Sequence, residues 1–148
     1  MLIREAMTRH VRTVSASSTL REAARVMAEI DAGVLPVAEN DRMIGMVTDR
    51  DIAVRGTAVG KGPEATVGEV MTPEVLYCYE DDAIEDVCEN MSDMQVRRLP
   101  VVNSDKRLVG IVSLADLAVR ADGPDAGMAL EGIARPGGLH TQAVDGRV

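Results

Sequence analysis

The sequence predicts an α+β fold made of two copies of one small unit, each running β-α-β-β-α. Three observations lead there: an internal repeat, apolar spacing that switches from helical to strand-like within each copy, and a glycine-rich stretch between the copies. A unit of about 60 residues buries little core by itself. We therefore expect the two copies to pack sheet to sheet with pseudo-twofold symmetry.

The repeat is visible in three matching segments. Each copy begins with a short segment, 3–8 in the first and 67–72 in the second, which we call its lead-in. The Met residues of the two lead-ins, Met7 and Met71, are 64 positions apart. The matched pairs are Ile3-Arg-Glu-Ala-Met-Thr8 with Val67-Gly-Glu-Val-Met-Thr72, Leu35-Pro-Val37 with Leu99-Pro-Val101, and Gly45-Met-Val-Thr-Asp-Arg-Asp51 with Gly110-Ile-Val-Ser-Leu-Ala-Asp116. The predicted organisation is repeat 1 over 1–58, a linker over 59–66, repeat 2 over 67–121, and a tail over 122–148 that is a short helix or flexible chain.

Each repeat first predicts an amphipathic helix. Apolar residues recur at helical spacing from Leu20 to Ile30 and, in the same register, from Ile84 to Met94. Thr19 with Glu22, and Asp82 with Glu85, have the spacing of an N-cap and its reciprocal acid. These pairs predict where the two helices begin.

Two strands and a second helix follow in each copy. Apolar segments with turn residues between them predict strands over 34–38 and 43–48, and over 98–102 and 107–113. The second helices are expected from about Asp49 and Leu114.

Composition excludes several functions. The chain has 148 residues, a net charge of −8 and only two aromatic residues, Tyr77 and Tyr79, so it lacks the basic groove and stacking rings that bind nucleic acid. No apolar run is long enough to span a membrane, and the charged N-terminus argues against a signal peptide, so we expect a cytoplasmic protein.

Catalytic and metal sites are not expected either. The sequence has no Ser-His-Asp or Cys-His set and no P-loop, and we predict no catalytic residue. Cys78 and Cys88 lack metal-ligand spacing, and the two histidines lie at opposite ends of the chain. Redox sensing by the two cysteines remains a minor alternative.

The segments that end in Asp51 and Asp116 carry the candidate ligand chemistry. In each, a strand ends in a hydroxyl, Thr48 or Ser113, and a carboxylate follows three residues later. One interpretation is a capping box, which needs no ligand. The other is a nucleotide site, in which the helix start and the hydroxyl bind phosphate and the carboxylate accepts bonds from both hydroxyls of a ribose. Spacing alone leaves both open.

Arg97 and Arg98 distinguish the two halves. They precede the strand of repeat 2, where repeat 1 has Gly33 and Val34. If they face the ligand, phosphate charge is neutralised on one side only, which predicts two unequal sites. The alternative is a solvated surface whose arginine stems cover apolar residues.

With its Met-Thr lead-ins, Leu-Pro-Val strands and two Gly-x-Val-[Thr/Ser]-x-x-Asp segments, the chain resembles the CBS-domain family, and in particular stand-alone tandem CBS pairs. The resemblance covers about Ile3 to Arg120. It implies clefts between the repeats that take AMP, ATP, S-adenosylmethionine or a related molecule as a regulatory ligand, with no required cofactor. It also implies a homodimer. Its implied ligand-binding residues are Thr48, Asp51, Ser113, Asp116, Arg98, Arg97, Val34, Thr13, Val14, Val75 and Leu76.

Two functions remain in competition. The first is a sensor that binds an adenosine-containing ligand and signals to a separate, unknown protein target. The second is a ligand-free interaction scaffold, in which the hydroxyl and acid pairs serve only as helix caps.

Overall fold

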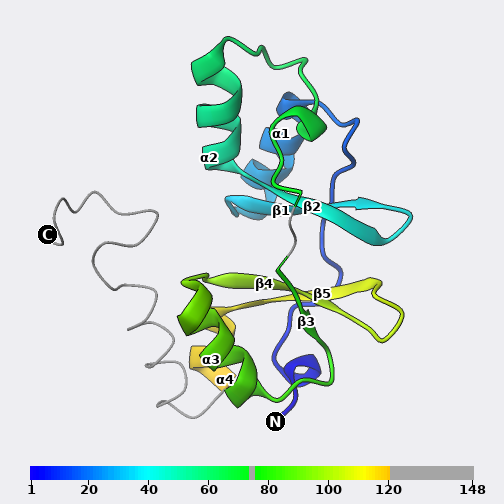
Figure 1. Ribbon diagram of the computed structural model, residues 1–148, viewed down its shortest axis with the longest axis vertical. Coiled ribbons are helices and arrows are strands. Elements are labelled where there is room, and N and C mark those ends of the chain that lie inside the picture. The colour runs from blue at the N-terminus through cyan, green and yellow to red at the C-terminus, as the bar shows by residue number, and fades with distance from the viewer. Residues whose placement is uncertain (74–75, 121–148) are drawn as a thin grey trace, which may run out of the picture. The chain divides into compact units, whose positions relative to one another are not determined.

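The structure, a computed structural model, describes residues 1–73 and 76–120, with side chains described up to Leu117 in the last helix (Figure 1). The predicted tail over 122–148 lies outside the described residues. The elements in chain order are η1 (Ile3–Glu5), α1 (Leu20–Ile30), β1 (Val34–Glu39), β2 (Arg42–Thr48), α2 (Asp49–Asp51), η2 (Ile52–Gly56), η3 (Thr57–Val59), η4 (Val67–Glu69), β3 (Cys78–Tyr79), α3 (Ile84–Met94), β4 (Arg98–Val102), β5 (Leu108–Ser113) and α4 (Leu114–Arg120).

The chain forms two compact units, and each borrows the lead-in of the other repeat. Among the described residues, the N-repeat unit comprises Val11–Leu76 with Asp105–Leu108, and the C-repeat unit comprises Met1–His10, Tyr77–Ser104 and 109–120. The lead-in of repeat 1 therefore packs with repeat 2, and the lead-in of repeat 2 packs with repeat 1. The compact units do not follow the order of the repeats in the sequence.

In the N-repeat unit, the sheet is centred on the antiparallel pair β1 and β2, in which Val34 is opposite Thr48. Val14 bridges to Val37 in parallel on the far side of β1, and the borrowed Thr72 bridges to Met46 beside β2. The first strand expected for this repeat is thus reduced to a single bridge.

The C-repeat unit has the same order of partners. Strand β3 is short and parallel to β4, β5 follows β4, and the borrowed Thr8 bridges to Ile111. The predicted α+β class is confirmed, and so are the predicted hairpin strands and long helices of both units, whereas the first strand of repeat 1 is only a bridge.

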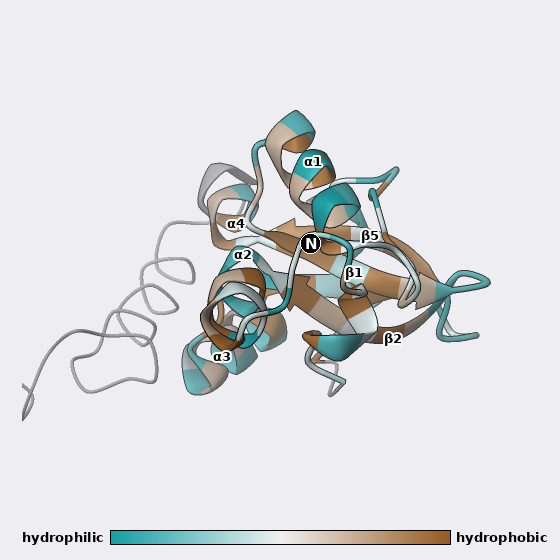
Figure 2. Ribbon diagram, turned by 90° about the horizontal axis from the view of Figure 1, so that it is seen from above, coloured by the Kyte–Doolittle hydropathy of each residue, from teal (hydrophilic) through white to brown (hydrophobic). Residues whose placement is uncertain are grey.

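Each unit has its own aliphatic core. The borrowed lead-ins contribute Val67 and Val70 to one core and Ile3, Ala6 and Met7 to the other. The strands are mostly brown in Figure 2, whereas the helices mix brown and teal, as expected of helices that bury one stripe. Over the residues that the structure describes, every helix falls short of the length and apolarity needed to cross a bilayer.

The predicted start of the first long helix is confirmed, and that of its repeat is one residue off. Thr19 is the N-cap of α1, and its hydroxyl accepts a bond from the Glu22 N–H at 3.1 Å. The prediction that Asp82 caps α3 is wrong, because the N-cap is Ala83, which makes no side-chain cap bond. The Asp82 carboxylate instead accepts from the Tyr79 N–H at 2.9 Å and closes the turn after β3.

Candidate functional site

Thr48 and Asp51 form a reciprocal capping box at the end of β2. The Thr48 hydroxyl oxygen accepts from the Asp51 N–H at 3.0 Å, and Asp51 Oδ2 accepts from the Thr48 N–H at 3.0 Å. Both side chains are partly buried. Each residue thus fixes the position of the other at the point where the strand becomes a helix.

Ser113 and Asp116 repeat this arrangement at the end of β5. Asp116 Oδ2 accepts from the Ser113 N–H at 3.0 Å, and the Ser113 hydroxyl oxygen accepts from the Asp116 N–H at 3.1 Å. The capping interpretation of the sequence is therefore confirmed as structure in both units.

The capping bonds use only part of the hydrogen-bonding capacity of the two carboxylates and two hydroxyls. An ionised carboxylate has two oxygens and about four acceptor positions. Among the described residues, Oδ1 of Asp51 and Oδ1 of Asp116 accept no further bond, and each hydroxyl keeps its own proton to donate. A ligand with vicinal hydroxyls can bind here while the cap stays intact.

The glycines of the two segments are explained by close backbone approach. A Cβ on Gly45 would lie 2.6 Å from the Thr72 carbonyl oxygen, and one on Gly110 would lie 2.9 Å from the Thr8 carbonyl oxygen. In both units the lead-in of the other repeat occupies this space. Because Gly45 and Gly110 have no Cβ, the backbone of the lead-in can pack directly against them.

The two sites differ in charge more than the Arg pair alone predicts. In repeat 1, the Asp49 N–H donates to the Gly33 carbonyl at 2.9 Å, and a Cβ on Gly33 would lie 2.7 Å from Asp49 Oδ2. In repeat 2, the Leu114 N–H donates to the Arg97 carbonyl at 2.8 Å. One site therefore has a carboxylate over a glycine, and the other has an arginine beside a leucine.

Asp49 lies beside the candidate site, and sequence reasoning did not single it out. Aligning the repeats pairs Gly33 with Arg97 and Asp49 with Leu114, and those two changes meet in space. The aligned repeats already show both differences. Only the hydrogen bond from the Asp49 N–H to the Gly33 carbonyl shows that the two positions are neighbours. Arg97 and Arg98 are exposed, and neither side chain has a partner among the described residues.

The remaining predicted ligand-binding residues differ in how exposed they are to solvent. Val34 is half-buried and lies opposite Thr48, and Thr13 is exposed. Leu76 is 47% exposed, and Val75 lies outside the described residues. Val14 is only 7% exposed, and its N–H and carbonyl bond to Pro36 and Ala38. Val14 is therefore a core and sheet residue, and its ligand contact stays a prediction.

Cys78 is chemically protected. It lies in the core of the C-repeat unit, with Sγ 3.8 Å from the Pro100 carbonyl oxygen. Burial, with a smaller contribution from the nearby Asp82 carboxylate, raises the pKa of the Cys78 thiol to about 12. Cys88 is 3% exposed. Within residues 1–73 and 76–120, no three His, Cys, Asp or Glu side chains gather as metal ligands.

We predict that neither cysteine reacts with iodoacetamide in the folded protein at pH 8. The thiolate is the reactive form, burial raises the pKa of Cys78, and Cys88 is covered by the core. Mass spectrometry should find both thiols unmodified in buffer and both alkylated in 6 M guanidinium. Rapid alkylation of Cys78 in the folded chain would instead support redox sensing.

Comparison with known proteins assigns the chain to a family. Residues 3–55 and 67–122 match the CBS domain family, so the chain belongs to that family and carries two copies of the domain. It is 42% identical over 132 residues to the CBS domain-containing protein YhcV of Bacillus subtilis (strain 168), covering 88% of this chain and 94% of the relative.

Two solved structures have the same fold. Hypoxic Response Protein I, crystallised with two coordinated zinc ions, is similar with a TM-score of 0.74 and 40% identity, covering 81% of this chain and 98% of that one. CBSX2 in complex with AMP is similar with a TM-score of 0.72 and 26% identity, covering 81% and 95%.

Proposed function

We propose that this chain is a cytoplasmic regulatory protein that binds an adenosine nucleotide and signals its occupancy to a separate protein target. AMP is the first candidate, with ATP and S-adenosylmethionine as alternatives. One observation carries the proposal: in both units a positioned carboxylate keeps an unused oxygen beside a hydroxyl. The AMP complex of CBSX2, a relative in fold, supports the choice of ligand.

In the proposed mode, Asp51 and Asp116 accept hydrogen bonds from the ribose hydroxyls. Thr48 and Ser113 donate to a ribose or phosphate oxygen. As the family resemblance implies, Val34 lines the cleft, and Thr13 with Val14 and Val75 with Leu76 belong to the two segments that sandwich the base. The protein is regulatory because binding shifts an equilibrium between arrangements that its target distinguishes. No step of this function requires bond making or breaking.

The two sites are expected to differ in preference. Arg97 and Arg98 supply exposed cationic groups to the site with Asp116, where they can form charge-assisted bonds to phosphate. Asp49 places a further negative charge close to the other site. We expect phosphate-bearing ligands to bind first at the site of the C-repeat unit.

Asp116→Asn separates the ligand role from the capping role. The asparagine carbonyl can still accept the Ser113 N–H, but the side chain loses its charge and its second acceptor oxygen. Calorimetric titration should show an AMP dissociation constant about 10- to 100-fold higher than that of wild type, since bonds to charged groups contribute about 1.5 to 3 kcal/mol. Thermal unfolding without ligand should change little. Asp51→Asn tests the other site in the same way.

Asp41→Asn is the matched control. Asp41 is exposed at a hairpin turn with φ of 64°, a conformation that asparagine tolerates. It should bind AMP as wild type does. Wild-type affinity for AMP in both Asp116→Asn and Asp51→Asn would contradict the ribose contacts.

A ligand-free scaffold is the second candidate, and the complete capping boxes favour it because they need no ligand. Thermal unfolding distinguishes the two functions. A ligand at 100 times its dissociation constant stabilises the folded state by about 2.7 kcal/mol. Absence of stabilisation by AMP, ATP or S-adenosylmethionine would favour the scaffold. In either case we propose that the protein is a homodimer.

A further inference from the structure

The candidate sites of the two units carry opposite charge at one shared position. In the N-repeat unit the Asp49 carboxylate lies against Gly33, because a Cβ on that glycine would be 2.7 Å from Oδ2 and 3.2 Å from Oδ1. In repeat 2 the aligned residues are Leu114 and Arg97, and the same backbone hydrogen bond joins them. A carboxylate in one unit therefore lies where the other unit has the base of an arginine side chain.

The residues that precede the first hairpin strand extend this contrast. The segment is Asp31-Ala-Gly-Val34 in repeat 1 and Gln95-Val-Arg-Arg98 in repeat 2. Asp31 and Gln95 both have a left-handed backbone, with φ of 54° and 55°, so the two segments leave α1 and α3 in the same way. Asp31 is exposed, and so are the two arginines. The segment thus brings one carboxylate to the N-repeat unit and two guanidinium groups to the C-repeat unit.

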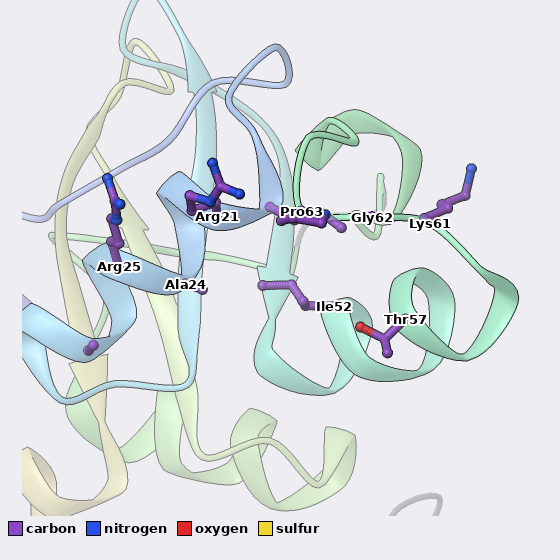
Figure 3. A pocket seen from close by; sticks show the side chains of 10 residues that line it. Arg21, Ala24, Arg25, Ile52, Thr57, Lys61, Gly62 and Pro63 are labelled. Atoms are coloured by element: carbon purple, nitrogen blue, oxygen red, sulfur yellow. The ribbon is translucent and has the colours of Figure 1, made fainter.

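Two cationic side chains of the N-repeat unit are engaged on another surface. The Arg21 guanidinium lies 2.7 Å from Glu64, and the Lys61 ammonium lies 3.0 Å from Glu69. Both cations line an apolar cavity of about 560 Å³ between α1 and the segment 52–63, and the carboxylate against the glycine is not part of that lining (Figure 3). These cations therefore do not cancel its charge.

Arg50 is the cation nearest to Asp49 in sequence, and it does not pair with that carboxylate either. The backbone N–H of Arg50, rather than its guanidinium, donates to Asp49 Oδ1 at 2.8 Å. Consecutive helical residues point about 100° apart, which directs the two side chains away from each other. Among the described residues, no cationic side chain lies within ion-pair distance of Asp49.

We propose that Asp49 is a specificity-determining residue, which makes the site of the N-repeat unit reject phosphate and favour an adenosine derivative with a cationic 5′ substituent, such as a sulfonium. A phosphate monoester carries about −1.5 to −2 charges at pH 7, so a carboxylate beside it is repulsive. A sulfonium at the same place is attracted. Arg97 and Arg98 give the other site the reverse preference.

The inference rests on the proposed function, because it assigns a charge class to the ligand of a site that the proposed function provides. It adds that the two sites are selective for different ligands. The chain then holds an anionic and a cationic adenosine derivative at the same time. Selectivity arises here from repulsion of the wrong ligand as much as from attraction of the right one.

Calorimetric titration of Asp49→Asn with three ligands tests the inference. Adenosine, AMP and S-adenosylmethionine share the nucleoside and differ in charge at the 5′ end. In an Asp116→Asn background, which weakens the other site, S-adenosylmethionine should bind more tightly than AMP. Adding Asp49→Asn should then lower the ratio of the AMP to the S-adenosylmethionine dissociation constant about 3- to 25-fold, because one repulsion and one attraction are lost at an exposed position. Adenosine affinity should change less than about twofold, because adenosine is uncharged.

Two control variants separate charge from shape. Asp49→Glu keeps the charge and should keep the preference, and Asp41→Asn removes an exposed carboxylate at a hairpin turn and should leave the ratio unchanged. The preference should weaken as salt rises, because the charges are exposed. An unchanged ratio in Asp49→Asn, or tighter binding of AMP than of S-adenosylmethionine at this site, would overturn the role of Asp49 alone. If none of the three ligands binds the wild-type chain, the proposed function is overturned and this inference with it.

Discussion

Gly45→Ala is expected to lower the free energy of unfolding of the N-repeat unit by about 1 to 3 kcal/mol, the usual cost of inserting atoms into a filled space. The new Cβ would lie 2.6 Å from the Thr72 carbonyl oxygen and 3.1 Å from Met71 Sδ. The methionine can rotate away, but the carbonyl cannot move freely. It accepts from the Met46 N–H at 2.9 Å, and the Thr72 N–H donates to the Met46 carbonyl at 2.8 Å.

Urea unfolding of Gly45→Ala and Gly62→Ala measures this effect against a matched control. A Cβ on Gly62 meets nothing within 4 Å, so alanine there should be neutral or stabilise by up to about 1 kcal/mol through the unfolded chain. Gly110→Ala tests the C-repeat unit, because its Cβ would lie 2.6 Å from Met7 Sδ and 2.9 Å from the Thr8 carbonyl oxygen. Equal stability of Gly45→Ala and Gly62→Ala would show that the borrowed lead-in can shift at little cost.

The double variant Arg97→Ala with Arg98→Ala is expected to raise the dissociation constant of AMP about 10- to 100-fold. Two charge-assisted bonds to phosphate are lost, each contributing about 1.5 to 3 kcal/mol when well formed, and exposure reduces that contribution. Adenosine, which has no phosphate, should lose less than about threefold. The ratio of the two dissociation constants is the diagnostic quantity, because a general loss of folding would affect both ligands.

Arg42→Ala with Lys106→Ala controls for the change in net charge, since both residues are exposed at hairpin turns. This control should keep the wild-type ratio of AMP to adenosine affinity. If it lowers that ratio as much as the Arg97 and Arg98 variant does, long-range attraction rather than direct contact accounts for the phosphate preference. An unchanged ratio in the Arg97 and Arg98 variant would instead mean that its side chains cover apolar surface.

Combining Gly33→Arg with Asp49→Leu would give the site of the N-repeat unit the residues of the other. The two positions are neighbours, because a Cβ on Gly33 would lie 2.7 Å from Oδ2 of the exposed Asp49 side chain.

The local structure of this protein was predictable from its sequence. The repeat, helices α1 and α3, the hairpin strands and the cap at Thr19 were all found, because each depends on apolar spacing or on a contact between residues a few positions apart. The pairing of Thr48 with Asp51 and of Ser113 with Asp116 was also readable for that reason. The spacing of these pairs predicts their contact with each other, but it does not identify a ligand.

Contacts between distant segments were decided only by the tertiary structure. The exchange of lead-ins, the pairing of Val14 with Val37 beside β1 and the approach of Asp49 to Gly33 all join residues that are far apart in sequence. Asp82 is a different case, because two local roles compete for it: its carboxylate accepts from the Tyr79 N–H three residues earlier and leaves the helix start to Ala83. Local spacing determines which elements form, but which surfaces meet depends on long-range packing, and single-sequence periodicity does not record it.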